Sequence, residues 1–137
     1  MSKSSSNVKL YSGSRKTARA TAAISAGSGR VRINKVPAEI VTPEVAREVI
    51  LTPLQLAGDI RDKVDIDVKV KGGGFMSRAE ASAIAISRAL VEWSKSSELK
   101  QKIIEFNKHL LAGDPRRTEP KKFGGPGPRR RKQKSYR

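Results

Sequence analysis

The sequence predicts an α+β domain, in which a small β-sheet is covered by helices on one face, followed by an extended basic tail. Three observations carry this prediction. Apolar and polar residues alternate at two places before residue 72, with the period of two that strands have. Residues 77–112 instead repeat apolar positions every three or four residues, as helices do. Residues 114–137 show neither pattern and are rich in Arg, Lys, Gly and Pro.

The first predicted strand spans residues 17–26, where Ala and Ile alternate with Thr, Arg and Ser. Alanine also favours helices, so a helix is the alternative here. A Gly-Ser-Gly turn at 27–29 favours a β-hairpin with residues 30–34 as the returning strand. Arg19, Arg30 and Arg32 should then point outward on one sheet face. The Ser-rich residues 1–8 are expected to be mobile.

Two Thr-Pro pairs follow, and each offers a threonine cap with proline at the first helical position. They predict short helices over 43–51 and 53–57, with Gly58 ending the second. In residues 64–71, Val and Ile alternate strictly with Asp and Lys, which predicts the best defined strand of the chain. With strands first and helices later, the topology should be α+β.

A helix is predicted to begin at Ser77, because Ser77 and Glu80 have the spacing of a capping box. Arg88 and Glu92 should form an exposed pair on its solvent side. A second helix should run from about Ser97 to Gly113. The residues expected to face the core are Ala79, Ala83, Ile86, Leu90 and Trp93 in the first helix, and Leu99, Ile103, Phe106 and Leu110 in the second.

The formal charge of +16 is confined to the two ends of the chain. Residues 1–38 hold eight bases and no acid, residues 39–113 hold eleven of each, and residues 114–137 hold ten bases and two acids. This distribution predicts a mobile N-terminus over 1–8, a folded body over 9–113 and a basic tail over 114–137. The two cationic ends should bind a polyanion, with nucleic acid the first candidate.

Composition excludes several classes of function. The chain has no cysteine and one histidine, which leaves no thiolate metal site and no Cys-His catalytic pair. The acids at 59, 62, 65 and 67 are more simply a solvated face than a cation site. We therefore expect no enzyme activity, no cofactor and no metal. No apolar run approaches the roughly 20 residues of a membrane span and no signal core is present, so we expect a cytoplasmic protein.

The loop Gly72-Gly73-Gly74 after Lys71 precedes a predicted helix, and three interpretations remain open for it. It can be a simple strand-to-helix turn, a contact to RNA phosphates, or a nucleotide site. The spacing of a nucleoside triphosphate loop is absent, which disfavours the last. Tyr11, Phe75 and Phe123 are isolated aromatics, so base-specific recognition is not indicated.

Several segments resemble the small-subunit ribosomal protein nine family, in its archaeal and eukaryotic branch. They are SRKTARATA, KGGG before a helix, SRALVEW, and AGDPRRTEPKKFGGPGPRRRKQKSYR at the end of the chain. The resemblance runs from about Lys9 to Arg137. It implies the fold of the second domain of ribosomal protein five, a body bound to ribosomal RNA in the head of the small subunit beside other head proteins, and a tail that reaches the peptidyl site.

In that family the terminal arginine, here Arg137, contacts the anticodon stem-loop of peptidyl-site tRNA. Members commonly have lysine before it; here Tyr136 takes that place, and Lys134 is the candidate to supply the lysine role. The residues predicted to contact ribosomal RNA are Arg15, Lys16, Arg19, Arg30, Arg32, Lys71, Gly72, Gly73, Gly74, Arg116, Arg117, Lys121, Lys122, Arg129, Arg130, Arg131 and Lys132.

Charge alone also permits a second class, an architectural DNA-binding protein. A nucleotide-dependent enzyme built on the glycine loop is a third and weaker alternative, because it lacks catalytic residues.

Overall fold

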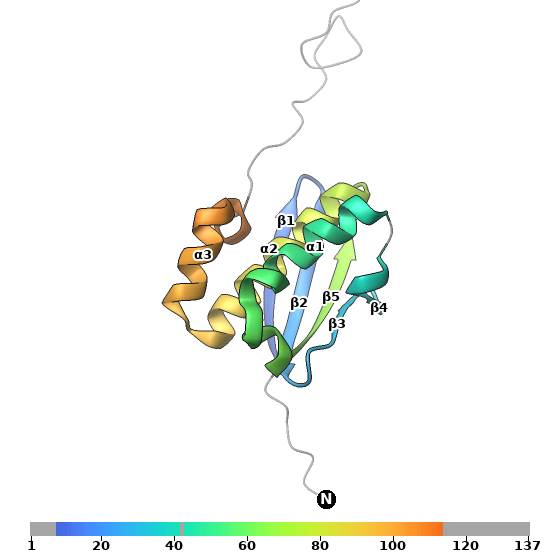
Figure 1. Cartoon of the computed structure of the whole chain (residues 1–137). Coiled ribbons are helices and arrows are strands. Elements are labelled where there is room, and N and C mark those ends of the chain that lie inside the picture. Colours follow the sequence, from blue (N-terminus) through green and yellow to red (C-terminus); the bar gives the residue numbers. More distant parts are fainter. Residues whose placement is uncertain (1–7, 42, 114–137) are drawn as a thin grey trace, which may run out of the picture.

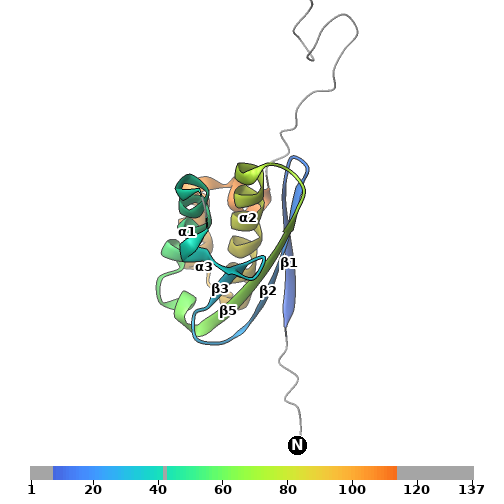
Figure 2. The ribbon, with the colours of Figure 1, turned by 90° about the vertical axis from the view of Figure 1, so that its right-hand side faces the viewer.

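The structure, a computed structural model, describes residues 8–41 and 43–113. Within these ranges five strands form one sheet in the order β1-β2-β5-β3-β4. Figures 1 and 2 show the helices on one face of this sheet and no element on the other. The strands are β1 Lys9–Arg15, β2 Ala18–Ala26, β3 Val31–Ile33, β4 Val36–Pro37 and β5 Val64–Lys71; the helices are α1 Glu44–Ala57, α2 Phe75–Ser94, α3 Ser97–Asn107 and α4 His109–Ala112.

The predicted α+β class and the one-sided helical layer are confirmed. Strand β5 has the predicted bounds, and its Val and Ile side chains are buried, whereas its Asp and Lys side chains lie on the uncovered face. The predicted mobile N-terminus, 1–8, and the predicted tail, 114–137, lie outside the described residues except for Val8, so the division into N-terminus, body and tail stays a prediction.

The predicted hairpin between residues 17–26 and 30–34 is wrong. Strand β2 pairs antiparallel with β1 and with β5, and β3 lies beyond β5, to which it runs parallel. The loop after β2 passes the start of β5 and bonds to it, with the Gly27 and Gly29 N–H groups donating to the Lys63 and Val64 carbonyls. Side-chain alternation shows which face of a strand is buried, but it does not show which strand lies beside it.

Strand β1 was missed in the sequence. Its inward side carries Tyr11, Gly13 and Arg15, a set of residue types that forms no apolar stripe. Of these three, only Gly13 is fully buried. The turn into β2 uses Lys16 with a φ of 54°. Gly13 lies against α2: a Cβ on it would come within 2.6 Å of the Ala81 carbonyl oxygen. The position of this strand depends on close packing of its backbone against α2, and such packing cannot be seen in a hydropathy pattern.

The two predicted helices at 43–57 form one helix, α1, which contains Pro53. Thr42 lies outside the described residues, and Pro43 precedes the helix without a side-chain cap. Thr52 does not cap a second helix, because its hydroxyl donates to the Glu48 carbonyl of the preceding turn (2.8 Å). Proline removes one helical hydrogen bond. Burial of Pro53, Ile50 and Leu54 offsets this loss and keeps the helix continuous.

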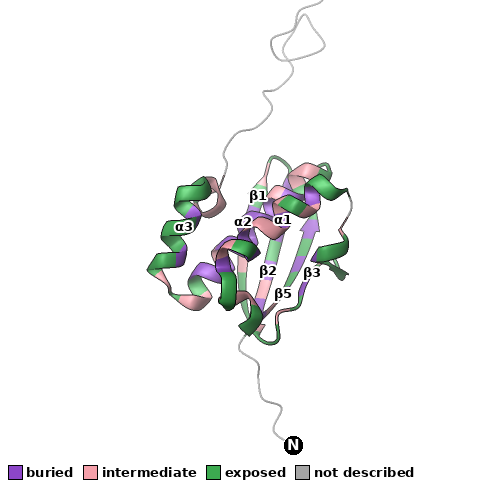
Figure 3. Ribbon diagram, in the orientation of Figure 1, coloured by how far each residue is buried: buried purple, intermediate pink, exposed green. Residues whose placement is uncertain are grey.

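Helix α2 begins at Phe75, so the capping box predicted at Ser77 is wrong. Its Glu80 instead accepts a hydrogen bond from Arg15. The helix is buried around most of its circumference, since it lies between the sheet and the other helices (Figure 3). Even Ser82 and Ser87 are fully buried, and their hydroxyls donate to carbonyls one turn earlier. Trp93 is half-buried against this core.

Helix α3 ends at Asn107, where the side-chain oxygen accepts the His109 N–H and a separate turn, α4, follows. Leu99 and Ile103 are buried, as predicted. The expectation that Phe106 faces the core is wrong, because its side chain is 61% exposed. Only a narrow stripe of α3 is buried, since α3 lies at the end of the helical layer (Figure 1).

The loop between β2 and β3 is organised by Asp65. One oxygen of its carboxylate accepts the backbone N–H groups of Ser28, Gly29 and Arg30 at 3.0, 3.2 and 3.0 Å. These bonds, that of Arg30 first, lower the pKa of Asp65, although partial burial opposes the shift. The ionised carboxylate therefore stabilises the fold more than the protonated acid does.

We expect Asp65→Asn to lower the free energy of unfolding by about 1–2 kcal/mol at neutral pH. A pKa that is lowered by folding adds stability above the pKa of the unfolded chain, and this stability is lost as pH falls through the folded-state value. The difference between the two proteins, measured by urea denaturation, should therefore shrink in acid. Asp67→Asn is the control, since Asp67 makes no such bonds; an equal loss in both variants would contradict the role of Asp65.

Candidate nucleic-acid interface

The uncovered sheet face carries a group of cations on two neighbouring strands. Arg19 on β2 lies opposite Lys71 on β5, and Thr21 lies opposite Lys69. Arg19, Lys69 and Lys71 are all exposed, because they alternate with the buried residues of their strands. Antiparallel pairing thus places these three cations together; we call them the sheet-face cations.

A hollow of about 570 Å³ lies among the sheet-face cations. Thr17, Thr21, Ala23 and Leu10 supply small or apolar walls, and among the described residues Asp67 is the one acid that lines it. Asp67 lies opposite Arg32 of β3 in the register, so a fourth cation is adjacent on the sheet. The hollow therefore offers an anion three positive charges and one negative charge, with Arg32 beside the negative one.

The glycine loop lies at one edge of this hollow. Gly72 and Gly73 have φ of +79° and +67°, values that side chains rarely allow. A Cβ on Gly72 would lie 2.7 Å from the Thr17 carbonyl oxygen, so the loop packs directly on the turn between β1 and β2. These observations support the tight-turn interpretation of the loop. The packing also brings Lys71 to the same end of the sheet as Lys16.

The other residues predicted to contact RNA are more scattered. The side chain of Arg15 is only 13% exposed and forms an ion pair with Glu80 (2.7 Å), on the helical side of β1. Arg30 is exposed in the loop that Asp65 organises, and Arg32 is exposed on β3. Gly74 precedes α2 as its capping residue. The predicted contacts from Arg116 to Arg137 lie outside the described residues.

Sequence reasoning overlooked Lys69 as a candidate. The strict alternation of residues 64–71 places Lys69 on the same face as Lys71, so the signal was present in the sequence. Its partner Arg19 could not be assigned, because the pairing of β2 with β5 was not predicted.

Arg88 holds the last described residues against the body. Its Nε donates to the Leu111 carbonyl (2.8 Å) and its Nη1 to the Ser12 carbonyl (2.7 Å). The predicted exposed pair of Arg88 with Glu92 is therefore wrong. The physical reason is that α4 and β1 both present carbonyl groups within reach of the guanidinium. Arg88 thus joins α2, β1 and α4 close to the last residue that the structure describes.

The described part of the chain contains no group of three or more His, Asp or Glu side chains placed to hold a metal ion. Over the same residues, no helix is both long and apolar enough to cross a membrane.

Comparison with known proteins tests the resemblance. The family model described as ribosomal protein S9/S16 matches residues 13–137. The chain belongs to this family. Small ribosomal subunit protein uS9 of Desulfurococcus amylolyticus is 56% identical, over 95% of this chain and 93% of that protein. The proteins of the same name from Halobacterium salinarum and Methanothrix thermoacetophila are 52% and 45% identical, each over 92% of this chain and 96% of their own length.

Membership of the ribosomal S9/S16 family confirms the resemblance found in the sequence. The protein is a structural constituent of the small ribosomal subunit and not an enzyme. Its partners are ribosomal RNA and other ribosomal proteins, and as part of the ribosome it is cytoplasmic. The family therefore favours RNA over DNA as the polyanion that the charge distribution predicts.

Proposed function

We propose that the body binds ribosomal RNA of the subunit head through the sheet-face cations. The observation that supports this proposal is the hollow on the uncovered sheet face, which Arg19, Lys69 and Lys71 line together. In the part of the chain that the structure describes, helices cover only the opposite face, which leaves this surface open to a partner (Figure 2). Strand pairing holds the three side chains at fixed backbone positions, which reduces the entropy lost when they bind phosphates.

Replacing Arg19, Lys69 and Lys71 with Gln should weaken binding to small-subunit ribosomal RNA. Each phosphate contact adds about 0.7–0.9 to the slope of log affinity against log salt, so three lost contacts should flatten the slope by about two to three units. Filter binding of the full chain over a salt series measures this. The matched control replaces Lys100, Lys102 and Lys108, three exposed lysines at or next to α3. Equal flattening in both triple variants would show that net charge, and not this surface, binds the RNA.

The tail, residues 114–137, is proposed to bind ribosomal RNA with its cations and to reach peptidyl-site tRNA with its end. Support comes from the ten bases in this segment and from the match of the family model through Arg137. A contact made by the last residues is effective because the RNA-bound part of the chain holds it at high local concentration. Arg137, Tyr136 and Lys134 are the residues proposed to contact the tRNA.

Deletion of Tyr136 and Arg137 should speed dissociation of tRNA from the peptidyl site, because a guanidinium contact to the tRNA phosphates is lost. Reconstituted small subunits with labelled tRNA provide the measurement, and incorporation of the protein should not change. Deletion of Ser2 and Lys3 is the control, since it also removes one cation from a chain end. Unchanged tRNA dissociation in the C-terminal deletion would reject the proposed contact.

A further inference from the structure

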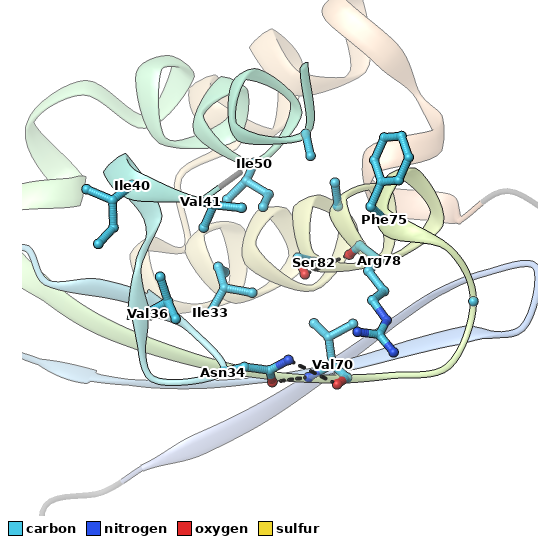
Figure 4. A pocket seen from close by; sticks show the side chains of 13 residues that line it. Ile33, Asn34, Val36, Ile40, Val41, Ile50, Val70, Phe75, Arg78 and Ser82 are labelled. Carbon is cyan, nitrogen blue, oxygen red and sulfur yellow. Dashed lines mark hydrogen bonds between the residues drawn. The ribbon is translucent and has the colours of Figure 1, made fainter. Parts of the chain in front are cut away.

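A second hollow, of about 530 Å³, opens at the far edge of the sheet from β1, between β3, β4, the start of α1 and the first turns of α2. Figure 4 shows Phe75 and Arg78 on one side of it, with Val36 and Ile40 opposite. Val36, Ile40 and Phe75 line this pocket, yet they are 41%, 61% and 60% exposed. Large apolar side chains grouped around a concavity are typical of a protein interface.

Most polar side-chain atoms of the pocket are already hydrogen-bonded within this chain, and the exception is the terminal nitrogens of Arg78. The Asn34 side-chain amide both donates to and accepts from the backbone of Val70, at 3.2 and 2.9 Å. The Ser82 hydroxyl donates to the Arg78 carbonyl (2.8 Å), and the Arg78 Nε donates to the Gly72 carbonyl (2.9 Å). A nucleobase would lose water from its polar edge and find few partners here, which is costly. An apolar side chain pays no such penalty.

In the described part of the chain, the acidic side chains near the pocket are paired with arginines, whereas two of the nearby cations are not paired with an acid. Glu39 is paired with Arg61 (2.9 Å) and Glu44 with Arg47 (3.7 Å). In contrast, Arg78 and Lys35, which lies between two lining residues, form no ion pair within the described residues. The surroundings of the pocket therefore have unneutralised positive charge, which favours an anionic partner. Because the pocket itself is lined by large apolar side chains, a protein segment with an apolar residue next to a carboxylate fits it better than a phosphate backbone does.

From these observations we infer that the pocket is a docking site for a neighbouring protein of the small subunit. The docked segment inserts a large apolar side chain between Ile40 and Phe75 and carries Asp or Glu within a few residues of it. This inference goes beyond RNA binding, and it depends on membership of the ribosome but not on the proposed role of the sheet-face cations.

A photoreactive benzoylphenylalanine at Ile40, in the full chain assembled into small subunits, tests the occupant directly. We expect one dominant crosslink, to a peptide of another small-subunit protein in which an apolar residue has an acidic neighbour. The same group at Phe106, which is equally exposed on α3, is the control. A dominant crosslink to RNA, to this chain or to a second copy of it would overturn the inference, as would a yield no higher than at Phe106.

Charge substitutions test the chemistry of the docking. Ile40→Asp and Lys35→Glu should each weaken incorporation of the crosslinked protein about tenfold, and Phe106→Asp should not. The slope of RNA binding against salt should stay unchanged in all three variants, which separates this inference from the proposed RNA surface. Replacing the partner's acidic residue with Lys should restore incorporation with Lys35→Glu. Full incorporation with Ile40→Asp, or no rescue by the exchanged charges, would contradict the inference.

Discussion

Gly13→Ala should destabilise the protein by about 3 kcal/mol, the largest stability loss that we expect from adding a single methyl group. The new Cβ would lie 2.6 Å from the Ala81 carbonyl oxygen and 2.7 Å from the Ala85 nitrogen. Both are backbone atoms of the most buried helix, α2, so neither can move aside as a flexible side chain would. Strand β1 must therefore shift away from α2, which also disturbs its pairing with β2.

Urea denaturation measures this loss, with Gly74→Ala as the matched control. A Cβ on Gly74 would meet no atom within 4 Å, so the same chemical change should cost less than about 1 kcal/mol. Similar midpoints for Gly13→Ala and the parent protein would mean that β1 does not pack on α2 as closely as the structure shows. A changed dependence on urea concentration would instead indicate partial loss of β1.

Arg129→Ala, Arg130→Ala and Arg131→Ala, combined in one chain, should strongly reduce RNA affinity. Residues 39–113 are electrically neutral, and the tail, with ten bases and two acids, supplies half of the net charge of +16. Losing three phosphate contacts should flatten the salt slope by up to about three units and reduce affinity on the order of a hundredfold near 0.1 M salt.

The same α3 lysine triple serves as the control for this tail variant, and both are measured on small-subunit ribosomal RNA. An unaltered salt slope would show that these side chains do not contact phosphates. The losses of RNA affinity in this variant and in the sheet-face variant can then be compared, which shows how much of the affinity comes from the body and how much from the tail.

Elements that follow from local side-chain chemistry could be predicted from the sequence. Residues 64–71 form β5 as expected, because strict alternation of branched apolar and charged residues suits only a strand with one buried face. Leu99 and Ile103 are buried as the helical spacing predicts. Pro53 misled the prediction, because burial of the residues around it outweighs the single hydrogen bond that proline removes.

The candidate RNA site, too, could be predicted from the sequence only in part. Arg19 was expected as a cation on a strand face and Lys71 as the cation before the glycine loop, and the structure brings them together. Arg15 has the same charge, yet it lies mostly buried against Glu80, because β1 turns that side chain toward α2. The role of Arg88 could not be foreseen either, since its two carbonyl partners come from segments 76 and 23 residues away.

By itself, then, the sequence determined the family, the α+β class, the buried faces of the regular elements and the placement of charge at the chain ends. These properties depend on residue types and on their spacing along the chain. Only the tertiary structure decided which strands are neighbours, that β1 belongs to the sheet, and that a second, apolar hollow exists at the opposite edge. Such features arise from contacts between segments that are distant in the sequence. The stability of these contacts depends on how closely one segment fits against another, and this fit leaves no periodic pattern in the sequence.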